Sequence, residues 1–215
     1  MKPSKQRATN ETEKQMRRQA IIAAAHTLAQ KNMLSAISMS NIAEQAGLAK
    51  GTLYLYFETK EEVFLALTQD LLNNWFDILD ESLRQTPEHS AHSLALTIAA
   101  SLNQNPLLMQ LLGMLHGELE VKSSYQAVLA FKQFLAKRLP ITGQLIEQAL
   151  PTLPMHMGMP TLLQLYALAI GIQQMNLQSE TLQKVIENHP LLDMSGGGFK
   201  QAFAQAAETL LRGVQ

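Results

Sequence analysis

The stretch that decides the fold is SMSNIAEQAGLAKGTLYLYF, residues 38–57. Its first half begins with Ser38, a residue type that suits a helix N-cap. Apolar residues then follow at the spacing of one helix face: Met39, Ile42, Ala43 and Ala46. Because a residue without a Cβ takes the left-handed conformation at little cost, Gly47 is predicted to end this helix in a sharp turn. A second helix is predicted over residues 49–56.

The second helix is predicted to have an inner and an outer face. Leu53 and Phe57 lie four residues apart and are expected to point to the core. The residues left for the outer faces are Lys50, Gly51, Thr52, Tyr54, Leu55 and Tyr56. Lysine and tyrosine suit phosphate oxygens, threonine can contact a base edge or a thymine methyl group, and glycine permits close approach. The pattern therefore predicts a helix-turn-helix that enters a DNA major groove.

The distribution of charge along the chain favours a nucleic-acid partner. The 215 residues have a formal net charge of -1. Residues 1–60 contain nine Lys or Arg and four Asp or Glu, a net charge of +5, and the remainder has a net charge of −6. This asymmetry indicates a DNA-binding amino-terminal end. The alternative is a solvated basic arm without such a partner.

The predicted helix-turn-helix and the residues on either side of it resemble the amino-terminal domain of the TetR family of bacterial repressors. The resemblance runs from Arg17 to Phe64 and rests on residues at fixed offsets: Ile21, Ala25, Leu28, Ile42-Ala43, Ala46-Gly47, Leu53-Tyr54, Tyr56-Phe57 and Lys60-Glu61. Asn32 stands where the family usually has glycine, and Ser40 stands at a position that is often basic. The predicted DNA-binding residues are the six outer-face residues of the second helix, together with Ser38, Ser40 and Lys60.

The chain is predicted to be all-α and to have three parts. Residues 1–11 are expected to form a basic, disordered arm, 12–58 the helix-turn-helix domain, and 59–215 a larger helical regulatory and dimerisation domain. The first helix is predicted to run from about Thr12 to Lys31. Thr59 and Glu62 have the spacing of a capping box that opens a long helix, which stops before Pro87. Later breaks are expected near residues 105–106, 117–124, 140–143, 151–160 and 189–198.

Two carboxy-terminal stretches are predicted to join two copies of the chain. Residues 161–176 are apolar on almost every side and residues 199–211 have one apolar face, so both stretches need to be buried. In the family that the chain resembles, the last two long helices form a four-helix bundle with a second subunit. The interface residues predicted on this basis are Leu165, Ala169, Ile172, Phe203, Ala206 and Leu210. A core within one monomer is the alternative.

The regulatory part is expected to hold a small molecule that controls DNA binding. The resemblance implies a pocket among the helices after residue 59, and the few charges between Ser90 and Asn176 favour a hydrophobic or neutral ligand. The candidate lining residues are Trp75, Leu79, Met109, Leu112, His116, Phe131, Phe134, Tyr166 and Met175. The alternative is a DNA-binding protein without a small-molecule ligand, regulated by a protein partner or acting architecturally.

The sequence predicts no enzyme, no cofactor and no metal site. Its six histidines are scattered without an HExxH-type pair, and the three glycines 196–198 lack the residues of a phosphate-binding loop. The segment from His116 to Glu120 is interpreted either as a site or as a solvated helix end. Without cysteine, no disulfide framework is expected. The polar amino terminus and the lack of a long apolar run favour a cytoplasmic protein without a membrane span.

Overall fold

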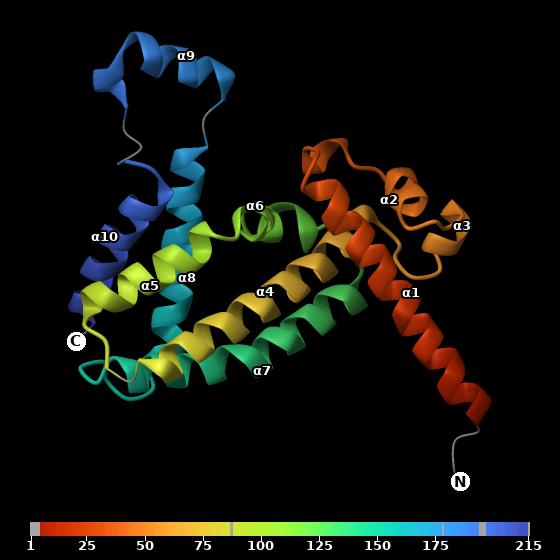
Figure 1. Ribbon diagram of the computed structural model, residues 1–215, viewed down its shortest axis with the longest axis horizontal. Coiled ribbons are helices and arrows are strands. Elements are labelled where there is room, and N and C mark those ends of the chain that lie inside the picture. Colours follow the sequence, from red (N-terminus) through yellow and green to blue (C-terminus); the bar gives the residue numbers. More distant parts are fainter. Residues whose placement is uncertain (1–4, 87, 178, 194–196, 215) are drawn as a thin grey trace. The chain divides into compact units, whose positions relative to one another are not determined.

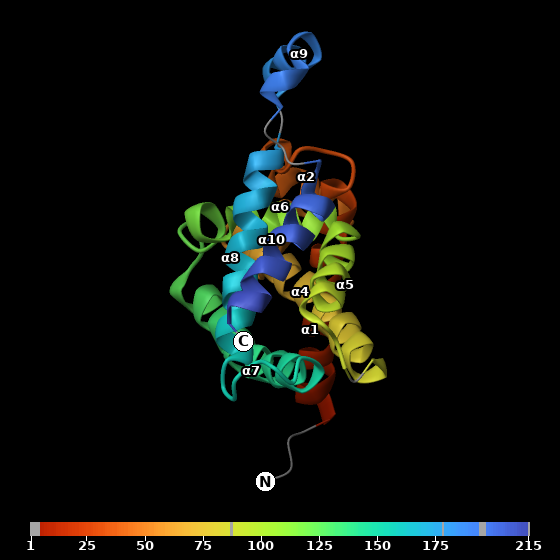
Figure 2. The same ribbon diagram turned by 90° about the vertical axis from the view of Figure 1, so that its left-hand side faces the viewer.

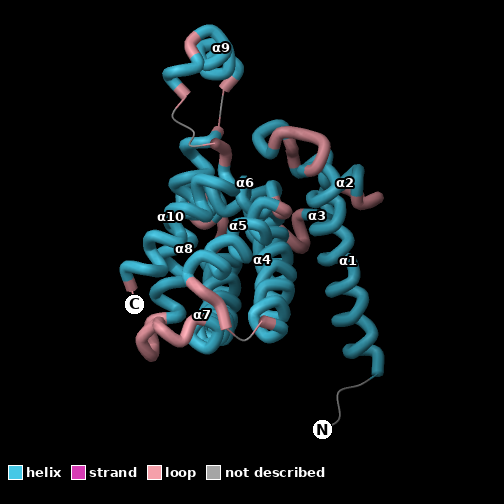
Figure 3. The backbone as a smooth tube through the Cα atoms, turned by 60° about the vertical axis from the view of Figure 1, so that its left-hand side comes forward, coloured by secondary structure: helices cyan, strands magenta, loops and turns pink. Residues whose placement is uncertain are grey.

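The computed structural model describes residues 5–86, 88–177, 179–193 and 197–214 of the chain. Within these residues the protein is all-α, as predicted, and Figure 3 shows helices and loops without a strand. The chain divides into two compact units. The first is Met1–Asp70 with Met114–Lys132, and the second is Leu71–Gly113 with Gln133–Gln215. In the described part of the chain, no helix has the length and apolar character needed to cross a membrane.

The first unit is built around the predicted helix-turn-helix. Its elements are α1 (Lys5–Ala29), a 3-10 turn (Leu34–Ala36), α2 (Met39–Gln45), α3 (Lys50–Leu53), the start of α4 (Lys60–Gln85), a π-helical turn (Leu115–Leu119) and the start of α7 (Tyr125–Ala149). α1 packs against α2, and α2 against α3 (Figure 1). Ile21, Ile42 and Leu53 have no exposed surface, so all three helices contribute to one core.

The first helix begins earlier than the sequence predicted. α1 starts at Lys5, so the structure places a helix where residues 5–11 were expected to be a disordered arm. The reason is local, since residues 5–11 contain neither glycine nor proline and include the good helix formers Lys5, Gln6, Arg7 and Ala8. α1 ends at Ala29, two residues before the predicted end. There the side chain of Asn32 donates a hydrogen bond to the Leu28 carbonyl oxygen at 2.9 Å.

The second unit contains the remaining helices. They are the rest of α4 and α7, with α5 (Ala91–Asn103), α6 (Pro106–Met114), α8 (Gly158–Asn176), α9 (Glu180–Asn188), a 3-10 turn (Pro190–Leu192) and α10 (Phe199–Gly213). α10 packs against both α5 and α8, which Figure 2 shows side by side. Leu94 of α5 and Phe203 and Leu211 of α10 have no exposed surface. The core of this unit therefore lies between these helices.

The predicted break at residues 140–143 is wrong. Pro140 and Gly143 both lie inside α7. Proline removes one intrahelical hydrogen bond, and the helix continues because Arg138 and Thr142, on either side of Pro140, both bond to Asp80 of α4. Gly143 serves close approach instead of a turn, because a Cβ there would lie 2.6 Å from the backbone nitrogen of Met159 at the start of α8.

A buried polar cluster ties α4 to α7 in the second unit. Asp80 is 1% exposed, and its Oδ1 accepts a hydrogen bond from Thr142 Oγ1 at 2.7 Å. Arg138 Nη1 lies 2.8 Å from the other oxygen of Asp80, and Arg138 Nη2 lies 2.6 Å from Asp77. Because an unpaired buried carboxylate is costly, this cluster fixes the register between the two helices.

Candidate nucleic-acid interface

A complete capping box opens α2, as the N-cap prediction for Ser38 requires. The backbone N–H of Asn41 donates to Ser38 Oγ at 3.2 Å, and the side-chain Oδ1 of Asn41 accepts from the backbone N–H of Ser38 at 3.0 Å. Ser38 Oγ also donates to Asn41 Oδ1 at 2.6 Å. The Ser38 hydroxyl is therefore engaged within the chain, and its first role is to hold the start of α2. Ser40, on the first turn, is exposed.

The turn after α2 has the geometry that Gly47 was predicted to supply. Gly47 has a φ of 67°, in the left-handed region. The Leu48 amide donates to the Ala43 carbonyl at 2.9 Å, and the Gly47 amide donates to the Glu44 carbonyl at 3.0 Å. This pair of bonds is a Schellman motif, which satisfies the last carbonyls of α2. Since a Cβ at positive φ is strained, the turn depends on glycine.

The second helix of the motif is shorter than predicted. α3 ends at Leu53 instead of Tyr56. The chain then continues in a tighter turn. The backbone N–H of Leu55 donates to the Thr52 carbonyl oxygen, and that of Tyr56 donates to the Leu53 carbonyl oxygen. Hydrogen bonds of this i to i−3 type narrow the coil, so residues 54–56 present their side chains from a turn.

The inner and outer faces of this segment are as predicted. Leu53 is 0% exposed and Phe57 is 4% exposed. Lys50, Gly51, Tyr54 and Leu55 are exposed, while Thr52 and Tyr56 are half-buried. Leu55 is 77% exposed, which leaves a large apolar side chain on a surface that also carries lysine and tyrosine. An exposed apolar group in such a place fits contact with a thymine methyl group.

In the part of the chain that the structure describes, nothing packs against the position of a side chain at Gly51. A Cβ at this position would meet no atom within 4 Å. Glycine inside a helix costs stability relative to alanine, so its presence here needs a reason outside the chain. Close approach of the helix to DNA is such a reason.

Lys60 is placed differently from the phosphate contact that the sequence predicted. Its Nζ donates to the carbonyl oxygens of Ile37 at 2.9 Å and Ser35 at 3.3 Å. Both carbonyls lie just before α2. Lys60 therefore holds the entry to the helix-turn-helix, and only part of its donor capacity is left for a phosphate.

Arg18 is a site residue that the sequence did not single out. Its guanidinium lies 5.0 Å from the centre of the Phe57 ring. Burial raises the pKa of the nearby Asp70 carboxyl, and the charge of Arg18 opposes this increase. The sequence offered only an arginine next to Arg17 in a basic helix, because the contact with Phe57 joins residues far apart in the chain.

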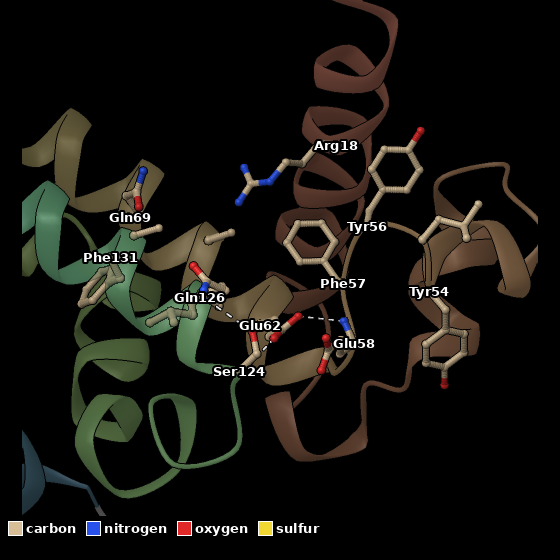
Figure 4. A pocket seen from close by; sticks show the side chains of 15 residues that line it. Arg18, Tyr54, Tyr56, Phe57, Glu58, Glu62, Gln69, Ser124, Gln126 and Phe131 are labelled. Carbon is tan, nitrogen blue, oxygen red and sulfur yellow. Dashed lines mark hydrogen bonds between the residues drawn. The ribbon is translucent and has the colours of Figure 1, made fainter. Parts of the chain in front are cut away.

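Glu62 joins the end of the recognition segment to the loop before α7. Figure 4 shows its carboxylate between Glu58 and Ser124. One carboxylate oxygen accepts from the Glu58 amide at 2.7 Å and the other from the Ser124 amide at 2.9 Å. Burial opposes the charged form, but hydrogen bonds from the Ser124 side chain and from both amides outweigh it and lower the pKa of Glu62.

The predicted capping box at the start of α4 is half correct. The Glu62 amide donates to Thr59 Oγ1 at 3.1 Å, as expected. The Glu62 carboxylate reaches the Glu58 amide instead of the Thr59 amide. Thr59 Oγ1 in turn donates to the Lys122 carbonyl at 3.1 Å. The beginning of α4 is thus tied to the segment 122–124 by two bonds that the sequence did not predict.

The predicted ligand residues are divided between the two units. His116 and Phe131 belong to the first unit and the others to the second. Those that are buried are Trp75, Leu79, Met109, Leu112 and Phe131. Phe134 and Tyr166 are half-buried. His116 is exposed and its Nδ1 lies 3.3 Å from Glu120, and Met175 is 66% exposed, so neither lines an enclosed apolar site.

The predicted dimer residues divide into two groups. Leu165, Ala169 and Phe203 are at most 2% exposed in the single chain. They already form the core between α8 and α10 and have no surface left for a second copy. Ile172, Ala206 and Leu210 are half-buried and keep part of their surface. Three of the six predicted residues are therefore buried within the single chain, and the interface itself stays a prediction.

Two family models match the chain. The model described as "Bacterial regulatory proteins, tetR family" matches residues 21–67. The model described as "Tetracyclin repressor-like, C-terminal domain" matches residues 69–215. Together they extend over both units of the structure.

Curated relatives match over a shorter range. The fatty acid metabolism regulator protein of Bacillus subtilis (strain 168) is 33% identical over 79 residues, which is 37% of this chain and 40% of the relative. The HTH-type transcriptional regulator EthR of Mycolicibacterium smegmatis is 34% identical over 77 residues, 34% of this chain and 36% of the relative. The matched part is therefore well under half the length of either relative.

Solved structures share the fold over nearly the whole chain. A TetR transcriptional regulator from Rhodococcus sp. RHA1 has a TM-score of 0.57 and 19% identity, covering 94% of this chain and 100% of that one. The regulator FadR from Bacillus subtilis in complex with stearoyl-CoA has a TM-score of 0.52 and 17% identity, covering 90% and 96%. With one family model covering residues 69–215 and another covering the helix-turn-helix, the chain belongs to the TetR family and is a DNA-binding transcriptional regulator.

Proposed function

We propose that this regulator is a homodimeric repressor that binds a palindromic operator and is released by a small hydrophobic ligand. The observation that carries the DNA-binding part is the outward surface of residues 50–56, in which nothing in the described part of the chain packs against the position of a side chain at Gly51. A capped α2 and a Schellman turn support this surface, so its geometry is preorganised for a groove.

The proposed DNA contacts differ in kind. Gly51 and Thr52 approach base edges, and Leu55 contacts a thymine methyl group. Lys50, Tyr54 and Tyr56 contact phosphates, with Ser40 as a neutral contact at the start of α2. Ser38 and Lys60 act mainly by positioning, because their polar groups already bond within the chain.

The proposed dimer interface uses the exposed face of α8. Leu163 and Met159 are 44% and 41% exposed, and Ala167 and Gly171 continue the same face at intervals of four residues. A Cβ on Gly171 would meet no atom of its own chain within 4 Å. Small residues on an outward face permit a second helix to approach closely. Ile172, Ala206 and Leu210 extend this surface, so the interface remains on α8 and α10 as proposed from the sequence.

The proposed ligand is a long acyl or alkyl chain. The buried apolar residues Trp75, Leu79, Met109 and Leu112 in the second unit, with half-buried Phe134 and Tyr166, support an apolar site. Phe131 is buried in the first unit and is not part of this proposed site. The name of the Bacillus subtilis relative, a fatty acid metabolism regulator, favours an acyl group. No observation favours the alternative of a DNA-binding protein without a small-molecule ligand.

The experiment that tests this function has two steps. The DNA bound by the protein is first mapped across a genome, and the bound sequence is used as the operator. Stearoyl-CoA is then titrated with and without operator. A ligand that prefers the DNA-incompetent state 100-fold corresponds to about 2.7 kcal/mol of coupling, and operator must weaken ligand binding by the same factor. Equal affinities in the two titrations would exclude stearoyl-CoA as the inducer.

A further inference from the structure

A pocket of about 320 Å³ lies in the first unit, beside the recognition segment (Figure 4). Its lining includes Arg18 of α1 and Tyr56 and Phe57 after α3. Leu65 and Gln69 of α4 and Phe131 of α7 also line it. This volume is at the lower end of the range for small-molecule sites. None of the DNA contacts proposed above uses the space itself.

Part of the pocket lining is apolar and already packed. Phe57, Leu65 and Phe131 are 4%, 2% and 1% exposed, so their side chains are held in place by the chain. Ala127 and Ala130 of α7 line the same space, and their short side chains keep it open. A preformed apolar lining binds a hydrocarbon or aromatic group without first reorganising.

Arg18 is the positively charged residue of the pocket lining, and within the described part of the chain its guanidinium has no hydrogen-bond partner. Among the residues that the structure describes, no carboxylate lies within ion-pair distance of Arg18, and Asp70 acts on it only at longer range. Its guanidinium lies over the Phe57 ring and extends toward Gln69 in Figure 4. The planar fork of a guanidinium matches a carboxylate in geometry and charge.

The two acidic residues of the pocket do not block this role. Both oxygens of Glu62 already accept hydrogen bonds from backbone amides. Glu58 is exposed, and Figure 4 shows it on the far side of Phe57 from Arg18. Arg18 therefore remains the group that orients an anion at this rim.

We propose that this pocket binds a small amphipathic carboxylate. The carboxylate pairs with Arg18, and the apolar body lies on Leu65 and Phe131. The pocket lining includes Tyr54, Leu55 and Tyr56, which belong to the proposed DNA surface. An occupant therefore changes the conformation of this DNA-binding segment directly. The regulatory consequence rests on the proposed function, whereas binding of the carboxylate does not. The site is distinct from the apolar site proposed around Trp75.

The test uses the full-length protein and 4-phenylbutyrate as the probe, with binding measured by isothermal titration calorimetry. We expect 4-phenylbutyramide, which lacks the charge, to bind about tenfold more weakly or worse, a factor that corresponds to about 1.4 kcal/mol. Arg18→Gln is expected to produce the same loss for the carboxylate, and Arg18→Lys a smaller one, because the charge stays but the fork is lost. Arg17→Gln is the matched control, because Arg17 is exposed and does not line the pocket.

A second variant tests the pocket without changing Arg18. Ala130 is an exposed rim residue, and Ala130→Phe is expected to fill the space and abolish binding of the probe. Circular dichroism melting establishes that each variant is folded. The inference is overturned if the wild-type protein does not bind the probe, if the carboxylate and the amide bind equally, or if Arg18→Gln and Ala130→Phe bind the probe as the wild type does.

DNA binding, measured in the same preparations, separates the two proposals. If the protein selects no DNA sequence but binds the carboxylate through Arg18, the proposed regulator function fails and the pocket stands. If the protein binds its operator and releases it with stearoyl-CoA, while the probe does not depend on Arg18, the pocket inference fails and the function stands. If both hold, 4-phenylbutyrate is expected to lower operator affinity in the wild type and in Arg17→Gln but not in Arg18→Gln.

Discussion

Replacing Gly51 by alanine is predicted to change stability and DNA affinity in opposite directions. The added Cβ meets no atom within 4 Å, and the residue is helical. Alanine is favoured over glycine by about 1 kcal/mol in a helix interior. Because Gly51 is the second residue of a four-residue helix, about half of this gain, roughly 0.5 kcal/mol, is expected. For a protein of this size, that raises the melting temperature by roughly 1 to 2 °C.

The same methyl group is predicted to weaken operator binding. If the backbone at Gly51 approaches a base pair, a Cβ pushes the helix outward and disturbs the neighbouring contacts of Lys50 and Thr52. Loss of one good contact costs about 1 to 3 kcal/mol, so a decrease of roughly 5- to 150-fold in affinity is expected. A destabilised fold cannot account for this loss, because the variant is expected to be more stable than the wild type.

The assays are thermal unfolding by circular dichroism and fluorescence anisotropy with the mapped operator at one fixed salt concentration. Gly213→Ala is the matched control, because a Cβ there also meets no atom within 4 Å and the residue lies at the end of α10. The control is expected to leave operator affinity unchanged. Unchanged operator affinity in Gly51→Ala would refute the close approach of this helix to DNA.

Three further predictions concern the lysines beside the helix-turn-helix, the Glu62 carboxylate and the exposed face of α8. Lys50→Ala is expected to lower the slope of log affinity against log salt by about one, with little change in melting temperature. Lys60→Ala is expected to lower the melting temperature, because the Ser35 and Ile37 carbonyls lose their donor. Equal salt slopes and equal melting temperatures for the two variants would contradict this division. The pKa of Glu62 in the folded protein lies below its ordinary value of 4.5, so its contribution to stability is present above pH 4.5 and is lost as the pH falls through the lower folded pKa. Glu62→Gln is therefore expected to reduce the free energy of unfolding at pH 7 and to flatten the acid side of the stability profile, and an acid profile parallel to that of the wild type would exclude this role. Leu163→Glu is expected to convert the dimer to a monomer in sedimentation velocity at micromolar concentration, with Met155→Glu, which changes a residue that is 77% exposed, as the control. Sedimentation of the wild type as a monomer would refute the proposed interface.

The sequence by itself determined the helix-turn-helix. Ser38 caps α2, Gly47 adopts the left-handed conformation, and Leu53 and Phe57 are buried, all as the spacing predicted. Each of these outcomes depends on atoms a few residues apart, so local rules are sufficient. The half-correct capping box at Thr59 marks the limit, since its backbone bond is local but the Glu62 carboxylate bridges to Ser124.

Only the tertiary structure decided which partner each buried or polar group has. Hydrophobic spacing predicted that Leu165 and Phe203 are buried, but it does not distinguish the core of one chain from a contact with a second copy. Lys60 carries the same charge whether it faces a phosphate or the Ile37 carbonyl, so its contact depends on how the chain folds back. Pro140 stays within α7 because packing outweighs the local cost of proline. Local sequence determines where a helix begins and which face is apolar, whereas the partner is determined by distances between segments that are far apart in the chain.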